Sequence, residues 1–118
     1  MLARLTLCLI PLCAPVAAQT FQPGDLVPSP HALVAPALEN FEYFGEGRPS
    51  ANITVAPNDN FQLEVLIEEG GFLDDSVAGS RTIYTIEYTA DGWQVLSATY
   101  EQSCYRAETR DWTTEPCP

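Results

Sequence analysis

Two β-rich runs meet at an Asp-Gly dipeptide in the stretch Arg81-Thr-Ile-Tyr-Thr-Ile-Glu-Tyr-Thr-Ala-Asp-Gly-Trp-Gln-Val-Leu-Ser-Ala-Thr-Tyr100. An Asp-Gly pair between two such runs is a strong signal for a β-hairpin, because both central residues of a type I′ turn need a positive φ angle. We therefore place Asp91 and Gly92 at the centre of the turn. The hairpin would be the middle of a β-meander that runs from Phe61 to Cys117.

The register of the hairpin follows from the choice of turn. Pairing Thr89 with Gln94 sets Tyr88 opposite Val95, and one face of the hairpin then becomes largely apolar. A slip of one residue would exchange the two faces. The predicted apolar face carries Tyr84, Ile86, Tyr88, Trp93, Val95, Ser97 and Thr99.

Further strands are expected before the hairpin. The segment Phe61–Glu68 alternates apolar and polar residues, which is typical of a half-buried strand. Ala51–Ala56 is a shorter strand candidate, and residues 57–60 have the composition of a turn. Glu68–Ser80 contains three glycines and is predicted to be a loop.

A short helix is predicted upstream of the strands. Ser29 is suited to the N-cap and Pro30 to the first helical position. Pro36 would kink or split the helix because proline lacks a backbone N–H and clashes with the preceding turn. The residues expected on one helical face are Leu33, Ala37, Phe41 and Phe44.

These elements define the predicted fold class and domain organisation. We expect an α+β fold in which a short N-terminal helical segment packs on a three- or four-stranded antiparallel β-meander with one disulfide. Residues 1–18 would be a signal peptide, residues 19–30 an extended lead-in, and residues 31–118 a single domain with a disulfide-closed C-terminal loop.

The first 18 residues have the three parts of a secretory signal peptide. Arg4 is followed by an apolar run, and Val16-Ala17-Ala18 supplies the small residues of a cleavage site. The apolar run is shorter than the roughly 20 residues that span a bilayer. We therefore expect export to the periplasm or the exterior, with no membrane span after cleavage.

The cysteines support the same compartment. Cys8 and Cys13 would leave with the signal peptide, so that Cys104 and Cys117 remain. An even number of cysteines in an exported chain favours a disulfide. A metal site is the alternative, but two thiolates alone make a poor zinc site and the single histidine, His31, is distant in sequence.

The chain is strongly acidic. It has five arginines and no lysine against 16 acidic residues, a net charge of −11, and removal of Arg4 makes the charge one unit more negative. This argues against nucleic acids and anionic membranes as partners, since both require a basic surface.

The second half of the chain resembles known proteins. The features that carry the resemblance are the acidic turn Asp74-Asp75, the hairpin with Trp93, and the segment from Cys104 to Cys117 that includes Arg106, Arg110 and Trp112. Together they resemble small exported bacterial proteins and, more distantly, the LppP/LprE lipoproteins. The resemblance implies export and a compact β-rich fold, and it assigns no catalytic residue.

One candidate ligand site is acidic. Carboxylates on a Gly-containing loop could bind Ca²⁺, which takes six to eight oxygen ligands. The spacing does not match an EF-hand loop, and solvated turn residues are the simpler interpretation. The candidate ligands in loop 68–75 are Glu68, Glu69, Asp74 and Asp75.

One candidate partner-binding site lies inside the disulfide loop. Arg106, Arg110 and Trp112 bring cationic and aromatic side chains together in an acidic chain, and both types are common at binding hot spots. We weigh this against a structural role, which we favour: Trp112 would close the open end of the sheet. The two arginines would then pair with Glu101, Glu108 or Asp111.

Catalysis finds little support in the sequence. There is no G-x-S-x-G nucleophile motif and no Gly-rich phosphate loop, and we assign neither a catalytic residue nor a cofactor. We expect a non-enzymatic interaction or accessory module whose partner is an envelope or extracellular protein. The alternative is a small ligand- or Ca-binding domain, or a hydrolase, that uses the acidic loop.

Overall fold

The structure is a computed structural model that describes residues 20–39, 49–71 and 76–118. Several predictions fall on residues outside these ranges: the signal peptide (1–18), the candidate ligands Asp74 and Asp75, and the helix-face residues Phe41 and Phe44.

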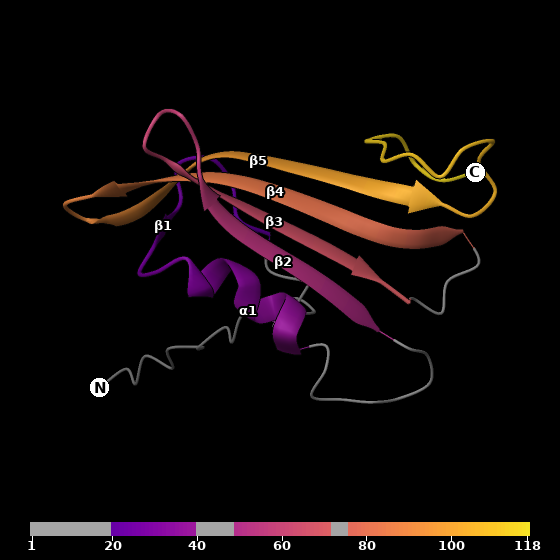
Figure 1. The fold of residues 1–118 in the computed structure, drawn as a ribbon, viewed down its shortest axis with the longest axis horizontal. Coiled ribbons are helices and arrows are strands. Elements are labelled where there is room, and N and C mark those ends of the chain that lie inside the picture. The colour runs from indigo at the N-terminus through magenta and orange to yellow at the C-terminus, as the bar shows by residue number, and fades with distance from the viewer. Residues whose placement is uncertain (1–19, 40–48, 72–75) are drawn as a thin grey trace, which may run out of the picture.

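Within the described residues, the fold is one five-stranded antiparallel sheet with one short helix beside it (Figure 1). The strand order is β1-β5-β4-β3-β2. The elements are, in chain order, β1 (Leu26–Val27), α1 (His31–Glu39), β2 (Ser50–Pro57), β3 (Leu63–Gly70), β4 (Val77–Thr89) and β5 (Gly92–Cys104).

The predicted antiparallel sheet, short helix and disulfide are confirmed, but the predicted count of three or four strands is wrong. The additional strand is β1, which precedes the helix and pairs with the start of β5. Flanking backbone bonds of 2.8 Å join Gly24 N to Val95 O and Val95 N to Asp25 O. A strand of two residues is too short to show alternation, so no sequence pattern predicts it.

The β4–β5 hairpin forms where predicted, but its turn is different. Thr89 pairs with Gly92, so the central residues of the turn are Ala90 and Asp91. Gly92 has a φ of 125°, whereas Asp91 has no positive φ, and the predicted type I′ turn is therefore wrong. The Thr89 hydroxyl donates to Gly92 O at 2.7 Å and accepts from Asp91 N at 3.2 Å, which holds the turn in this form.

The predicted hairpin register is also wrong, because the observed turn shifts the pairing by two residues and β5 then contains a bulge at Leu96. Ile86 pairs with Val95 and Thr85 with Ser97, so Leu96 has no opposite residue. The extra residue reverses the facing of the rest of β5. Ala98 consequently packs against the core, in place of the predicted Ser97 and Thr99.

The predicted Glu68–Ser80 loop is largely strand. Glu68 and Glu69 continue β3, and β4 begins at Val77. Gly79 is not a loop residue: a Cβ at this position would lie 2.7 Å from the backbone oxygen of Glu69. Glycine is therefore required here by the close approach of two strands rather than by a turn.

The core lies between α1 and one face of the sheet, which we call the inner face. Leu33, Val34 and Ala37 of the helix are buried there. The helix begins after Ser29-Pro30 as predicted, and it continues through Pro36 instead of splitting. The fully buried sheet residues are Val65, Ile86 and Val95. In the part of the chain that the structure describes, no helix has the length and apolar character needed to cross a membrane.

Candidate functional site

The opposite, outer face of the sheet carries a row of polar side chains. Antiparallel pairing sets Asn52 beside Glu68, Glu68 beside Arg81, and Arg81 beside Glu101. Directly opposed residues of paired strands point to the same face, and Glu68 follows the core residue Ile67, so all four side chains lie on the outer face. We call Asn52, Glu68, Arg81 and Glu101 the outer row.

Arg81 is the most connected residue of the outer row. Its Nη2 atom lies 3.0 Å from Glu101 Oε1 and 3.2 Å from Oε2, and its Nε lies 3.2 Å from Oε1. These side chains are 25% and 15% exposed, respectively. The guanidinium also lies over the Trp112 ring, 4.9 Å from its centroid. Arg81 therefore joins three segments that are distant in sequence.

The C-terminal residues 105–118, which we call the tail, are held against the sheet. The predicted disulfide between Cys104 and Cys117 is present, with a Cα–Cα distance of 5.4 Å. Backbone bonds of 2.8 and 2.9 Å join Gln102 to Thr113. The Ser103 hydroxyl donates to the backbone oxygen of Arg110 at 3.0 Å. The tail is thus fixed at both ends and in the middle.

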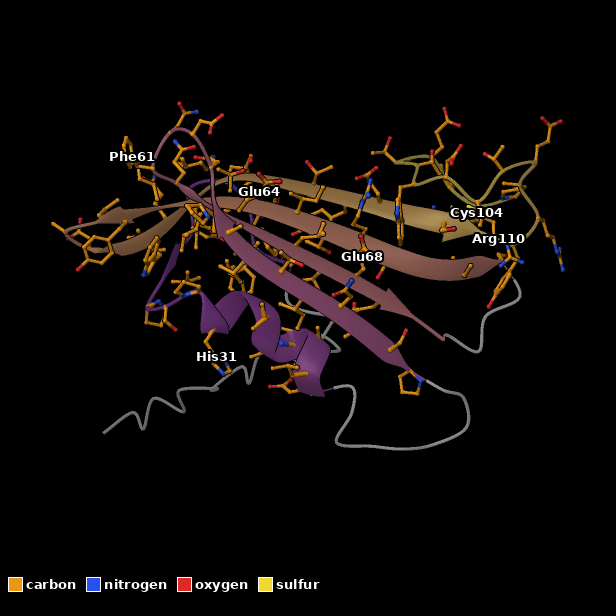
Figure 2. The ribbon with its side chains drawn as sticks, in the orientation of Figure 1. His31, Phe61, Glu64, Glu68, Cys104 and Arg110 are labelled. Atoms are coloured by element: carbon orange, nitrogen blue, oxygen red, sulfur yellow. A yellow bond between two sulfur atoms is a disulfide. The ribbon has the colours of Figure 1, made fainter. Side chains whose placement is uncertain are left out.

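A groove of about 340 Å³ lies where the tail meets the ends of β2 and β3. We call it the tail groove. Figure 2 shows Arg110 and Cys104 at this end of the sheet, with Glu68 on the strands closer to the middle of the sheet. The groove is lined by Ser50, Ala51, Asn52, Glu68, Glu69, Gly70, Ala78, Gly79, Ser103, Arg110 and Trp112.

The tail groove combines parts of both predicted sites. From the partner-binding set it receives Arg110 and Trp112, and from the acidic set it receives Glu68 and Glu69. Arg106 does not line the groove and is exposed on the tail. The Arg110 guanidinium lies 5.1 Å from the centroid of the Tyr105 ring. Two residues of each predicted site therefore line the same groove.

The two described acidic candidates do not converge on one point. Glu68 and Glu69 are consecutive in β3, so their side chains leave opposite faces of the sheet. Glu69 also contacts Ser80, whose hydroxyl lies 3.4 Å from Glu69 Oε2. Among the described residues, no group of three or more His, Cys, Asp or Glu side chains is arranged to hold a metal ion.

Glu68 differs from the other charged residues of the outer row. Glu101 is paired with Arg81, whereas the Glu68 carboxylate has no hydrogen bond or ion pair with any described residue. Glu68 is half-buried and shares the groove with the Trp112 indole. A carboxylate next to an aromatic ring is suited to binding a cationic side chain.

Sequence reasoning missed Asn52, Arg81 and their place in the site. The predicted register sets Arg81 opposite Gln102, whereas the observed turn and the bulge in β5 together bring it opposite Glu101. Glu101 was one of three acidic residues, with Glu108 and Asp111, that were predicted to pair with Arg106 and Arg110, and it pairs with Arg81 instead. No local sequence pattern marks the bulge at Leu96, so the pairing of Arg81 with Glu101 could not be predicted from the sequence.

A second cavity, of about 540 Å³, lies between α1 and the inner face. Tyr84 and Tyr100 line it, with their hydroxyl oxygens 3.1 Å apart. The Tyr100 hydroxyl donates to Phe21 O at 2.7 Å, so Tyr84 donates to Tyr100. Burial, followed by the bond to Tyr100, raises the pKa of Tyr84 above its ordinary value. This chain of bonds ties the segment before β1 to the sheet.

The chain matches no protein-family model, no curated protein and no solved structure.

Proposed function

We propose that the protein is an exported binding module that uses the tail groove to hold a basic segment of an envelope or extracellular protein. The observation that carries this proposal is the half-buried, unpaired carboxylate of Glu68 in the same groove as the Trp112 indole. A lysine or arginine side chain of the partner would pair with Glu68 and contact the aromatic ring.

The charge of the chain supports a basic partner. The net charge of −11 attracts cationic proteins over a long range and speeds their encounter. Arg81 is already neutralised by Glu101, so it opposes a second cation less than a free arginine would. The groove therefore offers one available negative charge at a defined place on an acidic surface.

The export component of the proposal is supported by two features. The sequence of residues 1–18 has the organisation of a signal peptide. The Cys104–Cys117 disulfide is of the kind that persists in oxidising compartments. The intact mass of the protein recovered outside the cytoplasm should correspond to a chain that begins at Gln19. A mass that includes residues 1–18 would contradict export by cleavage.

The groove is tested with a defined probe. In a Trp93→Phe background Trp112 is the remaining tryptophan, and its fluorescence can follow the titration of an arginine-rich peptide. We expect saturable binding, and Glu68→Gln should weaken it about tenfold or more, since a hydrogen bond to a charged group contributes roughly 1.5–3 kcal/mol. A glutamate-rich peptide of equal length should leave the fluorescence unchanged.

Glu87→Gln is the matched control for this experiment. It removes the same charge from an exposed position of β4, opposite Gln94 and near the β4–β5 turn. Binding should be unaffected by this change. Equal weakening by Glu68→Gln and Glu87→Gln would show that the peptide responds only to total charge. This result would contradict the tail groove as the binding site.

A further inference from the structure

The strand β2 is an edge of the sheet. One edge of β2 pairs with β3 along all eight residues. No described segment pairs with its other edge, which we call the free edge (Figure 1). In an antiparallel pair, alternate residues direct their N–H and C=O groups away from the neighbouring strand. The free edge of β2 therefore presents backbone donors and acceptors that can pair with another strand.

The usual protections of an edge strand are missing from β2. Its sequence, Ser50-Ala-Asn-Ile-Thr-Val-Ala-Pro57, contains no charged residue, and its proline is at the last position. The pairing of β2 with β3 runs without a bulge. The strand also exposes an apolar side chain, since Val55 is 47% exposed. Long, uncharged and regular edges are the ones that accept a further strand.

The other edge of the sheet is protected, which makes the contrast informative. Near its start, β5 pairs with β1. The N–H and C=O groups of Val95 are hydrogen-bonded to Asp25 and Gly24, which precede β1. Near its end, Gln102 is bonded to Thr113 of the tail. Between them, the bulge at Leu96 makes this edge irregular. Only β2 therefore presents an open, regular edge among the described strands.

A second copy of the chain is the occupant that fits this edge best. The net charge of −11 opposes contact between two copies over most of the surface, whereas two β2 strands would meet without apposing any charge of their own. Antiparallel pairing of identical strands also satisfies two-fold symmetry, so each strand offers the other the same set of groups.

We propose that two copies of the chain pair through β2, antiparallel, with Thr54 on the two-fold axis. Directly opposed residues of antiparallel strands point to the same face. The two-fold axis must therefore lie where a residue is directly opposite its own copy in the other chain. With Thr54 on the axis, Ile53 of each copy faces Val55 of the other on the inner face. These are β-branched cross-strand pairs, which stabilise sheets, and they cover the exposed Val55 side chain.

The proposed pairing is independent of the partner proposed for the tail groove. Ser50, Ala51 and Asn52 line that groove at one end of β2. Because the two strands run in opposite directions, the two tail grooves would lie at opposite ends of one continuous sheet. A dimer of this form would be bivalent.

Cysteine cross-linking tests the axis directly. Opposed Cα atoms of an antiparallel pair are about 4.5–5.5 Å apart, a distance that a disulfide spans. The chain carrying Thr54→Cys should therefore form a covalent dimer under mild oxidation. Thr99→Cys is the matched control, since Thr99 is exposed at the other end of the same cross-strand row (Thr54, Leu66, Ile83, Thr99). The native Cys104–Cys117 disulfide is present in both variants, so any exchange with it affects the test and the control alike.

Sedimentation equilibrium tests the association without cross-linking. The wild-type chain from residue 19 should be dimeric at micromolar concentration, Thr54→Lys should shift the dissociation constant at least tenfold towards monomer, and Thr99→Lys should sediment as the wild type. A wild-type chain that stays monomeric would leave the β2 edge to a strand of another protein and would overturn the proposal, as would equal cross-linking of the two cysteine variants.

Discussion

The guanidinium of Arg81 lies 4.9 Å from the centroid of the Trp112 ring. This contact joins the middle of the sheet to a tail that is otherwise held by the Cys104–Cys117 disulfide and the backbone bonds of Gln102. The same guanidinium is bonded to both carboxylate oxygens of Glu101. Arg81 therefore sets the position of the indole that forms one wall of the tail groove.

Removal of Arg81 should loosen the tail and destabilise the domain moderately. Arg81→Ala eliminates a partly exposed ion pair, worth up to about 1 kcal/mol, and a cation–π contact worth about 0.5–1 kcal/mol. We expect a loss of about 1–2 kcal/mol in urea unfolding, with a red shift of Trp112 emission in the Trp93→Phe background. Arg110→Ala is the control, because its guanidinium lies over the exposed Tyr105 ring and not over Trp112. A native-like Trp112 spectrum in Arg81→Ala would contradict the role of Arg81.

Gly79 should be intolerant of a side chain, because its ideal Cβ lies 2.7 Å from the Glu69 backbone oxygen. Gly79→Ala forces two strands apart and should cost about 1–3 kcal/mol, the usual cost of overpacking. Its partner across the strands, Gly70, is a matched control. The Cβ of Gly70→Ala would meet the Ser50 hydroxyl at 3.2 Å, and this side chain can rotate away. Urea unfolding of both variants measures the difference, and equal stability would contradict the clash.

These two positions show what the sequence could and could not predict. The hairpin, β3 and the helix start were predictable because alternation, Asp-Gly and Ser-Pro are local signals, although β3 begins at Leu63 and not at the predicted Phe61. Gly79 was wrongly assigned to a loop, because glycine occurs both in loops and where two strands approach closely, and the sequence alone does not distinguish these roles. The requirement at Gly79 comes from Glu69, a residue on the neighbouring strand.

The candidate site was predicted only in part for a related reason. Trp112 and Arg110 stood out by composition, and the disulfide followed from the parity of the cysteines. The contribution of Arg81 depends on the register of β4 and β5, and this register is set by a bulge that no local pattern marks. The acidic and aromatic candidates were treated as separate sites, because a contact between segments so distant in sequence arises from the sheet topology.

Phe61 is held in a left-handed backbone conformation at the β2–β3 turn, with a φ of 59° and a side chain that is 97% exposed. Asn58 fixes this turn, because its Oδ1 accepts hydrogen bonds from the backbone N–H groups of Asn60 and Gln62. Phe61→Gly should raise stability by up to about 1 kcal/mol, since glycine adopts a positive φ without steric cost.

Phe61→Ala separates backbone strain from the loss of the ring. Alanine retains the strain, and the exposed ring contributes no buried contact, so this variant should unfold at the same urea concentration as the wild type. A gain in stability with alanine equal to that with glycine would show that the exposed ring, and not the φ angle, is unfavourable.

Tyr84 should make the domain sensitive to alkaline pH. The side chain is 3% exposed, and burial raises the pKa of its hydroxyl, as does the bond to Tyr100. In the unfolded chain a tyrosine ionises near pH 10, roughly, whereas the folded domain keeps Tyr84 neutral. The stability that depends on this neutral hydroxyl is therefore fully present below about pH 10, and it falls as the pH rises towards the folded-state pKa.

Tyr84→Phe removes the titrating group and tests this argument. Near neutral pH the variant should be less stable by about 1 kcal/mol, because the hydrogen bond to Tyr100 is lost. Above about pH 10 the difference should shrink and then reverse, since the wild type alone loses about 1.4 kcal/mol per pH unit through this group. Urea unfolding at a series of pH values between neutral and alkaline measures both regimes. Parallel stability curves for the two proteins would mean that Tyr84 ionises as readily in the folded domain as in the unfolded chain.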